Sequence, residues 1–162
     1  MNGKVEYLVM DVDGTLTDGK IYMGPDGEAM KAFDIKDGFG IHDMLIPSGI
    51  QPVIITGRTS TIVERRCKEL GIDFLFQGVK DKVKVLMDFL KGRNSDLSRV
   101  AYIGDDLNDM GCMDFVLSAG GIIGSPANAV EGVKAKATFV SKHDGGNGAV
   151  RDFIEYIIST VE

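Results

Sequence analysis

Two aspartates, Asp11 and Asp13, directly follow an apolar, strand-prone run at residues 5–10. Residues two apart on an extended chain point the same way, so both carboxylates would lie on one side at the end of a buried strand. Gly14 lets the backbone turn sharply after them. Because adjacent carboxylates repel each other and are costly beside an apolar sheet, the pair favours a divalent cation, a shared proton, or both.

A calcium loop or a solvated acidic turn would also fit Asp-x-Asp-Gly. The EF-hand, however, needs a third ligand before its glycine, a glutamate at the end of its loop and a helix on each side. Those ligands are missing here, and a strand-like run precedes the motif. Oxygen ligands favour a hard ion, so we expect Mg²⁺ at this pair.

Asp11 is suited to attack phosphorus, because a carboxylate is ionised at neutral pH and needs no activating base. Asp13 could protonate the leaving alkoxide and later deprotonate the water that hydrolyses an aspartyl-phosphate. A phosphate monoester carries about two negative charges, so positive groups must offset them. We expect Mg²⁺ to be held by Asp11, the backbone carbonyl of Asp13 and Asp105, while Lys82 supplies a fixed positive charge. Thr56 and the Gly57 amide would donate hydrogen bonds to the phosphoryl oxygens.

These residues lie in a chain that alternates strands with helices, which predicts a mainly parallel sheet covered by helices on both faces. Strands are expected at residues 5–10, 51–55, 74–76, 100–103, 116–119 and 139–140. Helices are expected from Asp37-Gly38, over 60–70, from about 83 to 92, in a short segment begun by Ser125-Pro126, and over the last residues. Around Gly24-Pro25-Asp26-Gly27 we expect a β-hairpin. Ligands of such folds bind beyond the carboxyl ends of the strands, where the Asp-Val-Asp, Thr-Gly-Arg and Gly-Asp-Asp segments would converge.

The composition narrows the possible classes. The chain has 162 residues, of which 44% are hydrophobic and 26% charged, and suits a single domain over 1–162. A net charge of -6 argues against nucleic-acid binding. Neither a signal peptide nor a membrane-spanning run is evident, so a cytoplasmic location is expected. Cys67 and Cys112 have no spacing that indicates a disulfide or a zinc site.

The ordered set of motifs resembles the haloacid dehalogenase superfamily of phosphatases. The residues that carry this resemblance are Asp11-Val12-Asp13-Gly14-Thr15, Thr56, Lys82 and Gly104-Asp105-Asp106-Leu107-Asn108-Asp109. Within the superfamily the chain is similar to the capless 3-deoxy-D-manno-octulosonate (KDO) 8-phosphate phosphatases and their nonulosonate 9-phosphate relatives. The segments that carry this closer similarity are Thr17-Asp18-Gly19, Asp37-Gly38-Phe39-Gly40-Ile41, Thr56-Gly57-Arg58, Arg65-Arg66-Cys67, Phe76-Gln77-Gly78-Val79 and Gly145-Gly146-Asn147-Gly148-Ala149-Val150-Arg151.

The resemblance implies a Rossmann-like fold without a cap domain, in which four subunits assemble through the hairpin at about residues 20–33. It also implies that a neighbour's C-terminal tail, about residues 141–162, helps to close the active site. A neighbouring subunit would then replace the lid that this chain lacks, since an open site admits water.

A sugar acid carries a carboxylate remote from its phosphate, which a positioned arginine would bind. Arg58 and Arg66 are the candidates by their matching positions, and Arg58 resembles the octulosonate branch. His42 and the Lys142-His143-Asp144 segment depart from the common pattern, which leaves the substrate pocket open.

Three functions follow from the sequence. The first is a Mg²⁺-dependent KDO 8-phosphate phosphatase of cell-surface glycan (lipopolysaccharide) synthesis. The second is a nonulosonate (sialic-acid type) 9-phosphate phosphatase. The third is a non-catalytic oligomerisation module, as occurs in fusions to cytidylyltransferases, against which the intact Asp11, Asp13, Lys82 and Asp105 set argues.

Overall fold

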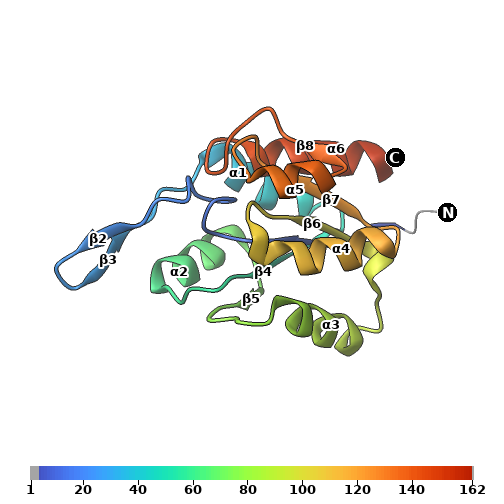
Figure 1. The fold of residues 1–162 in the computed structure, drawn as a ribbon, viewed down its shortest axis with the longest axis horizontal. Coiled ribbons are helices and arrows are strands. Elements are labelled where there is room, and N and C mark those ends of the chain that lie inside the picture. Colours follow the sequence, from blue (N-terminus) through green and yellow to red (C-terminus); the bar gives the residue numbers. More distant parts are fainter. Residues whose placement is uncertain (1–3, 162) are drawn as a thin grey trace.

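A computed structural model describes residues 4–161 and contains a six-stranded sheet between two layers of helices (Figure 1). The strand order is β5-β4-β1-β6-β7-β8, and every neighbouring pair is parallel. This confirms the predicted α/β class. The strands are β1 (Tyr7–Met10), β4 (Gln51–Ile55), β5 (Phe74–Phe76), β6 (Val100–Ile103), β7 (Ile122–Ser125) and β8 (Phe139–Val140).

The helices divide between the two faces of the sheet and bury a separate apolar cluster on each. Leu8 and Met10 of β1 point into one cluster, whereas Tyr7 and Val9 point into the other, which explains why this strand is apolar throughout. On the first face lie α1 (Ile35–Phe39), the π-helix η1 (Gly40–Leu45), α2 (Thr61–Leu70) and α6 (Ala149–Val161). On the second lie α3 (Lys82–Gly92), α4 (Met110–Ser118) and α5 (Glu131–Lys136), with the short 3₁₀ turns η2 (Leu97–Arg99) and η3 (Leu107–Asp109) between elements.

The strand predicted at residues 116–119 is wrong, because this stretch belongs to helix α4 and the loop after it. Cys112, Met113 and Val116 recur at helical spacing and are fully buried against the sheet. The helix ends before Gly120, whose φ of +88° suits a glycine. The true strand, β7, therefore begins at Ile122.

The short helix predicted to begin at Ser125-Pro126 is also placed wrongly. Ser125 is the last residue of β7, and its carbonyl accepts the amide hydrogen of Ser141 at 2.9 Å, so it belongs to the sheet. Pro126 belongs to a turn, in which its carbonyl accepts from the amide of Ala129 at 3.2 Å. The helix, α5, begins five residues later than predicted, at Glu131.

The helix predicted from Asp37-Gly38 begins two residues earlier, at Ile35. Asp34 acts as its N-cap, because its side chain accepts hydrogen bonds from the amides of Lys36 and Asp37. The buried Asp37 then contacts the start of α6, where its Oδ1 accepts from the amide of Arg151 at 2.9 Å.

The β-hairpin is confirmed, and it forms a separate two-stranded sheet of β2 (Tyr22–Gly24) and β3 (Gly27–Met30). In Figure 1 it extends away from the sheet and helices. Within residues 4–161 no inserted cap domain covers the carboxyl ends of the strands. None of the helices described is both long and apolar enough to cross a membrane.

Residues 141–161 pack on their own chain. Gly145 and Gly146 lie so close to Gly14 and Thr17 that a side chain at either would meet backbone atoms. In α6 an apolar stripe is fully buried, made by Val150, Phe153, Ile154 and Ile157. The contribution of this tail to a neighbouring subunit stays a prediction.

Candidate active site

Three neighbouring strands end at the same edge of the sheet, because β1 pairs in parallel with both β4 and β6. Asp11 follows β1, Thr56 follows β4, and Asp105 lies two residues beyond β6. The structure thus brings together three motifs that are far apart in the sequence, at the edge where parallel sheets bind ligands.

Lys82, the first residue of α3, points into this edge and is almost fully buried. Its Nζ donates to Oδ1 of Asp11 at 3.0 Å and to Oδ1 of Asp109 at 2.9 Å. Burial would lower the pKa of the Lys82 ammonium, but the two carboxylates outweigh burial and raise it. Lys82 is therefore a fixed positive charge beside Asp11.

Asp109 is the last residue of the Gly104–Asp109 motif, and no role was predicted for it. It is fully buried, and its Oδ1 also accepts from the Tyr102 hydroxyl at 2.7 Å. Its Oδ2 accepts from the amides of Asp105 and Asp106 at 3.1 and 3.3 Å. Asp109 thus fixes Lys82 and the turn that carries Asp105. Its place four residues after Asp105 was the signal available in the sequence.

One carboxylate oxygen from each of Asp11, Asp105 and Asp109 lies within 4.8 Å of the other two, which suits a shared cation. Four protein donors already occupy the oxygens of Asp109, whereas among residues 4–161 the Asp105 side chain accepts one hydrogen bond, from Thr15 at 3.3 Å. Asp11 and Asp105 are therefore the better placed ligands. Gly14 permits this approach, since a Cβ there would lie 2.0 Å from Asp105 Oδ2 and its φ is +89°.

Burial and mutual repulsion disfavour the charged forms of these carboxylates. Burial, then the charge of Asp109, raises the pKa of Asp11 to about 6, against the opposing effect of Lys82. Burial, then the charges of Asp11 and Asp109, raises the pKa of Asp105 to about 8. A hard divalent cation would offset both effects, so this all-oxygen site fits Mg²⁺.

Asp13 is bound by a second lysine. Nζ of Lys31, just beyond β3, donates to Oδ1 of Asp13 at 2.6 Å and lies 3.0 Å from Oε2 of Glu28. Neither hairpin residue was singled out in the sequence. No sequence signal marked them, because the contact depends on where the chain lies as it leaves the hairpin.

Three of the other predicted site residues, Thr56, Gly57 and Arg58, directly follow β4. Thr56 is buried at the end of β4, and Gly57 follows it at the surface. Arg58 is half exposed, and its Nη2 lies 3.7 Å from Oε2 of Glu28. Arg58 therefore lies beside the hairpin, on the Asp13 side of the site.

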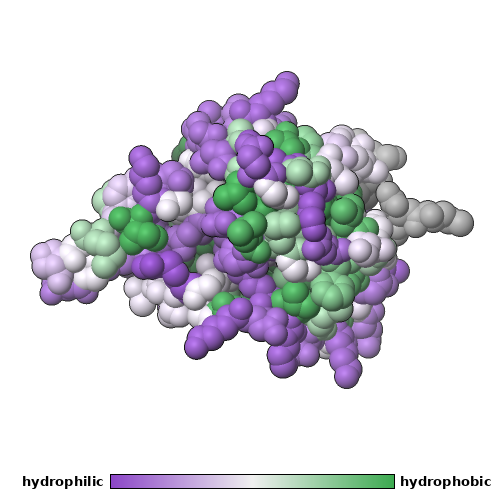
Figure 2. Space-filling model, viewed as in Figure 1, coloured by the Kyte–Doolittle hydropathy of each residue, from purple (hydrophilic) through white to green (hydrophobic). Residues whose placement is uncertain are grey.

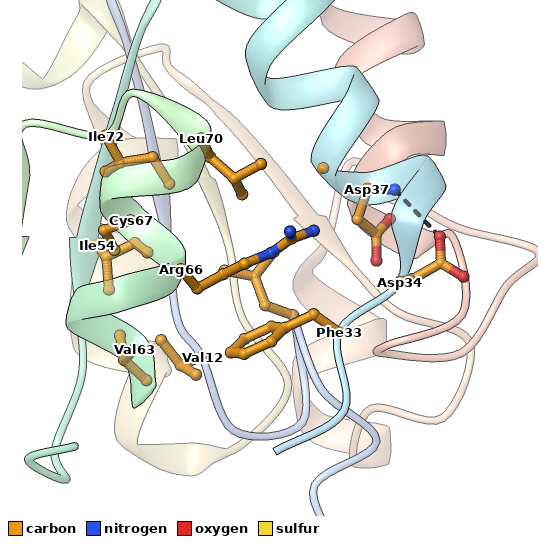
Figure 3. Close-up of a pocket in the computed structure, with 12 residues that line it drawn as sticks. Val12, Phe33, Asp34, Asp37, Ile54, Val63, Arg66, Cys67, Leu70 and Ile72 are labelled. Atoms are coloured by element: carbon orange, nitrogen blue, oxygen red, sulfur yellow. Dashed lines mark hydrogen bonds between the residues drawn. The ribbon is translucent and has the colours of Figure 1, made fainter. Parts of the chain in front are cut away.

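Arg66 occupies a different place, a small cavity between α1 and α2 on the first face of the sheet (Figure 3). Its guanidinium lies 5.6 Å from the centre of the Phe33 ring and pairs with Glu69 at 3.3 Å. Val12, which lies between Asp11 and Asp13 in the sequence, lines the same cavity as Arg66. Arg66 and Arg58 thus pair with different acidic residues, Glu69 and Glu28.

His42 lies on η1, whereas the Lys142-His143-Asp144 segment directly precedes Gly145, which packs against Gly14. His42 is exposed on η1, where its Nδ1 lies 3.3 Å from Asp43. His143 lines an open groove together with Lys36 and Arg151.

Similar proteins share the fold over nearly all of this chain, which spans about four fifths of their own length. No family model matches it. The KDO 8-phosphate phosphatase of Escherichia coli K12 is 41% identical over 154 residues, which cover 95% of this chain and 79% of that protein. The crystal structure of the Yersinia pestis enzyme of that name has a TM-score of 0.90 at 41% identity, covering 97% of this chain and 82% of the other.

The chain belongs to the KDO 8-phosphate phosphatase family of the haloacid dehalogenase superfamily.

Two further members of the family carry ligands. The structure of the Moraxella catarrhalis enzyme, with magnesium, phosphate and KDO bound, has a TM-score of 0.88 at 41% identity and covers 96% of this chain and 86% of that one. A cobalt-bound Haemophilus influenzae enzyme has a TM-score of 0.89 at 35% identity and covers 98% of this chain and 90% of that one. Together with the acidic site described above, this supports Mg²⁺ as the cofactor.

Proposed function

We propose that this protein hydrolyses KDO 8-phosphate to KDO and phosphate, as a Mg²⁺-dependent phosphatase acting through an aspartyl-phosphate. The observation that carries the proposal is the buried Lys82 between Asp11 and Asp109, with Asp105 beside them. This arrangement gives a carboxylate nucleophile, a fixed positive charge and a cation site at one sheet edge. The identity to phosphatases of that name supports the substrate.

In the first step a carboxylate oxygen of Asp11 forms a bond to phosphorus, and the ester P–O bond breaks. Asp13 transfers a proton to the leaving sugar oxygen. In the second step Asp13 removes a proton from water, which attacks phosphorus and releases phosphate from Asp11. Lys82 keeps Asp11 in place and offsets negative charge during both steps.

The bound phosphoryl group needs further donors. The Thr56 hydroxyl and the Gly57 amide lie at the end of β4, next to β1, and would donate to its oxygens. Mg²⁺ held by Asp11, Asp105 and the backbone carbonyl of Asp13 would supply charge neutralisation between nucleophile and phosphate.

The substrate carboxylate is assigned to Arg58, with Arg66 as the second candidate. Arg58 lies beside Glu28 and is half exposed, so its guanidinium is available to a ligand at the open side of the site. Arg66 is enclosed by Phe33, Glu69 and the α1 segment, which makes its contribution the less direct of the two.

We also propose that the chain is one domain over 1–162 and forms a homotetramer through its hairpin. Ile21, Met23 and Met30 leave 39%, 64% and 52% of their surface exposed, and the hairpin carries apolar surface on the face seen in Figure 2. Such a cluster favours a protein interface. In this arrangement a neighbour's tail closes the site that lacks a cap.

The pathway follows from the substrate. Release of KDO would precede nucleotide activation in lipopolysaccharide synthesis, and we place this step in the cytoplasm. Fractionation of cells that express the protein at its natural level would test this location.

The decisive experiment compares turnover of KDO 8-phosphate with that of a nonulosonate 9-phosphate, each with Mg²⁺ and with a chelator. Selective, chelator-sensitive hydrolysis of KDO 8-phosphate supports the proposal. Preference for the nonulosonate would assign the sialic-acid alternative. Hydrolysis of neither, in a folded and Mg²⁺-loaded protein, would refute both assignments and leave the oligomerisation module.

A further inference from the structure

The hairpin supplies a lysine to the active site of its own chain. The Lys31 side chain is only 3% exposed, although it belongs to a segment that projects from the body of the protein. Its Nζ lies 2.6 Å from Oδ1 of Asp13 and 3.0 Å from Oε2 of Glu28. A buried ammonium is costly unless it is paired, so these two carboxylates determine where Lys31 lies.

Glu28 is itself fixed to the body of the protein. Its Oε1 accepts from the hydroxyl of Ser60 at 2.7 Å, and Ser60 is the residue that precedes helix α2. Its Oε2 also lies 3.7 Å from Arg58. A continuous series of contacts therefore runs from the start of α2 through Glu28 and Lys31 to Asp13.

This series leaves one oxygen of Asp13 available. Oδ1 is bound by Lys31, whereas Oδ2 makes no hydrogen bond with any residue among 4–161 that the structure describes. Asp11 is held separately by Lys82. Each carboxylate of the pair thus has its own lysine, so Asp13 can face a leaving group while Asp11 faces phosphorus.

We propose that Lys31, held by Glu28, is a positioning residue that orients Asp13 for proton transfer to the leaving oxygen. This inference rests on the proposed phosphatase activity. It adds that the hairpin contributes to catalysis within its own chain, through Asp13 and without contact to the phosphoryl group.

The test uses aryl phosphates, because their leaving groups differ in their need for a proton while their phosphate is the same. Phenol release in a single turnover is measured with Mg²⁺ for 4-nitrophenyl phosphate, whose leaving group is a weak base, and for phenyl phosphate. The variants are Lys31→Met, Lys31→Arg and Glu28→Gln. Lys20→Met is the matched control, since Lys20 is exposed near the hairpin and makes no ion pair with the described residues.

In Lys31→Met we expect phenyl phosphate to react about 100-fold more slowly. The rate with 4-nitrophenyl phosphate should change by less than about threefold, because general acid catalysis assists only the poorer leaving group. Lys31→Arg should restore most of the loss, Glu28→Gln should show a smaller loss of the same kind, and Lys20→Met should match wild type. Equal slowing of both substrates would indicate a merely structural role and overturn the inference. A rise in KM for both with unchanged rates would assign Lys31 to phosphate binding and also overturn it.

Failure of the proposed function would look different. A wild-type protein that hydrolyses neither the aryl esters nor KDO 8-phosphate fails as a phosphatase, which removes the inference with it. A wild type that hydrolyses both esters but not KDO 8-phosphate refutes the substrate alone, and the comparison of variants then still decides the role of Lys31.

Discussion

Nζ of Lys82 lies 3.0 Å from Oδ1 of Asp11, and both side chains are less than 10% exposed. An exposed ion pair contributes little, but a buried one cannot lose a partner without leaving a charge unpaired away from water. Lys82 is therefore expected to contribute to stability, and in the proposed mechanism it also offsets charge during catalysis.

Lys82→Met should lower the free energy of unfolding by about 3–5 kcal/mol, because Asp11 and Asp109 would share a buried site without a cation. Urea denaturation at pH 7 in the presence of a chelator measures this change. Lys84→Met is the control on the same helix, since its pair with Asp88 is exposed. A stability equal to that of wild type would show that water or another group already compensates the carboxylates.

Asp11→Asn should reduce turnover by at least about 10⁴-fold, because a neutral amide cannot attack phosphorus. The change hardly alters volume and Lys82 keeps its bond to Asp109, so the circular dichroism spectrum should match that of wild type. Trapping of a phosphorylated protein from wild type but not from the variant would locate the phosphoryl group. Retained turnover would rule out the aspartyl-phosphate mechanism.

The metal-free protein should become more stable as the pH falls from about 8 to about 4.5. Burial, with charge repulsion, raises the pKa of Asp105 to about 8 and those of Asp11 and Asp37 to about 6. A carboxyl whose pKa is raised on folding binds protons more tightly in the folded state, so its contribution to stability declines as pH rises through this window. Carboxyls with a lowered pKa, such as Glu28, act with the opposite sign, below about pH 4.5.

Thermal melts in a chelator across this pH range check the effect. Asp37→Asn should flatten the curve between pH 4 and 6, since Asp37 lies away from the metal site and is buried. Added Mg²⁺ should stabilise the protein more at pH 8 than at pH 6, because protons compete with the ion for Asp11 and Asp105. A melting temperature that rises steadily with pH in the chelator would contradict the assignment of these carboxyls.

Arg58→Ala should raise KM for KDO 8-phosphate about tenfold or more, as expected for the loss of a charged hydrogen bond. With 4-nitrophenyl phosphate, which has no carboxylate, KM should stay unchanged. Arg66→Ala, measured in parallel, tests the second candidate. An unchanged KM in the Arg66 variant would remove Arg66 from the substrate site, and an equal rise for both substrates in the Arg58 variant would assign Arg58 to phosphate.

Replacing both exposed methionines of the hairpin, Met23 and Met30, with aspartate should dissociate the proposed tetramer. The charges would have to be buried in the interface, which costs far more than leaving them in water. Light scattering coupled to size-exclusion chromatography gives the mass of each protein. A wild-type mass of one chain would refute the tetramer, and an unchanged tetramer in the double variant would place its interface elsewhere.

Much of this architecture could be predicted from local patterns. Strands such as Gln51–Ile55 and Val100–Ile103 were predicted at their observed bounds, because a buried parallel strand is a continuous apolar run with polar ends. Residues 116–119 were assigned wrongly because four apolar or small residues read equally well as strand or helix. This stretch continues helix α4, because Val116 lies on the helix face that Cys112 and Met113 already bury.

The grouping of the candidate site residues at one edge of the sheet was predictable in part. Asp11, Thr56 and Asp105 each follow a strand, so the parallel sheet alone brings them to one edge. The roles of Asp109 and Lys31 depend on side-chain contacts across 27 and 18 residues, with Lys82 and Asp13 respectively. No periodic pattern encodes such contacts, which is why the sequence did not show them.

The central place of β1 has a consequence for biosynthesis. β1 pairs with β4 and β6, so its apolar residues find their second neighbour only after Ile103 has been made. At ribosomal speed this leaves the strand waiting for roughly 5–20 seconds. During that interval the nascent chain exposes an apolar, aggregation-prone segment that a ribosome-associated chaperone would have to shield.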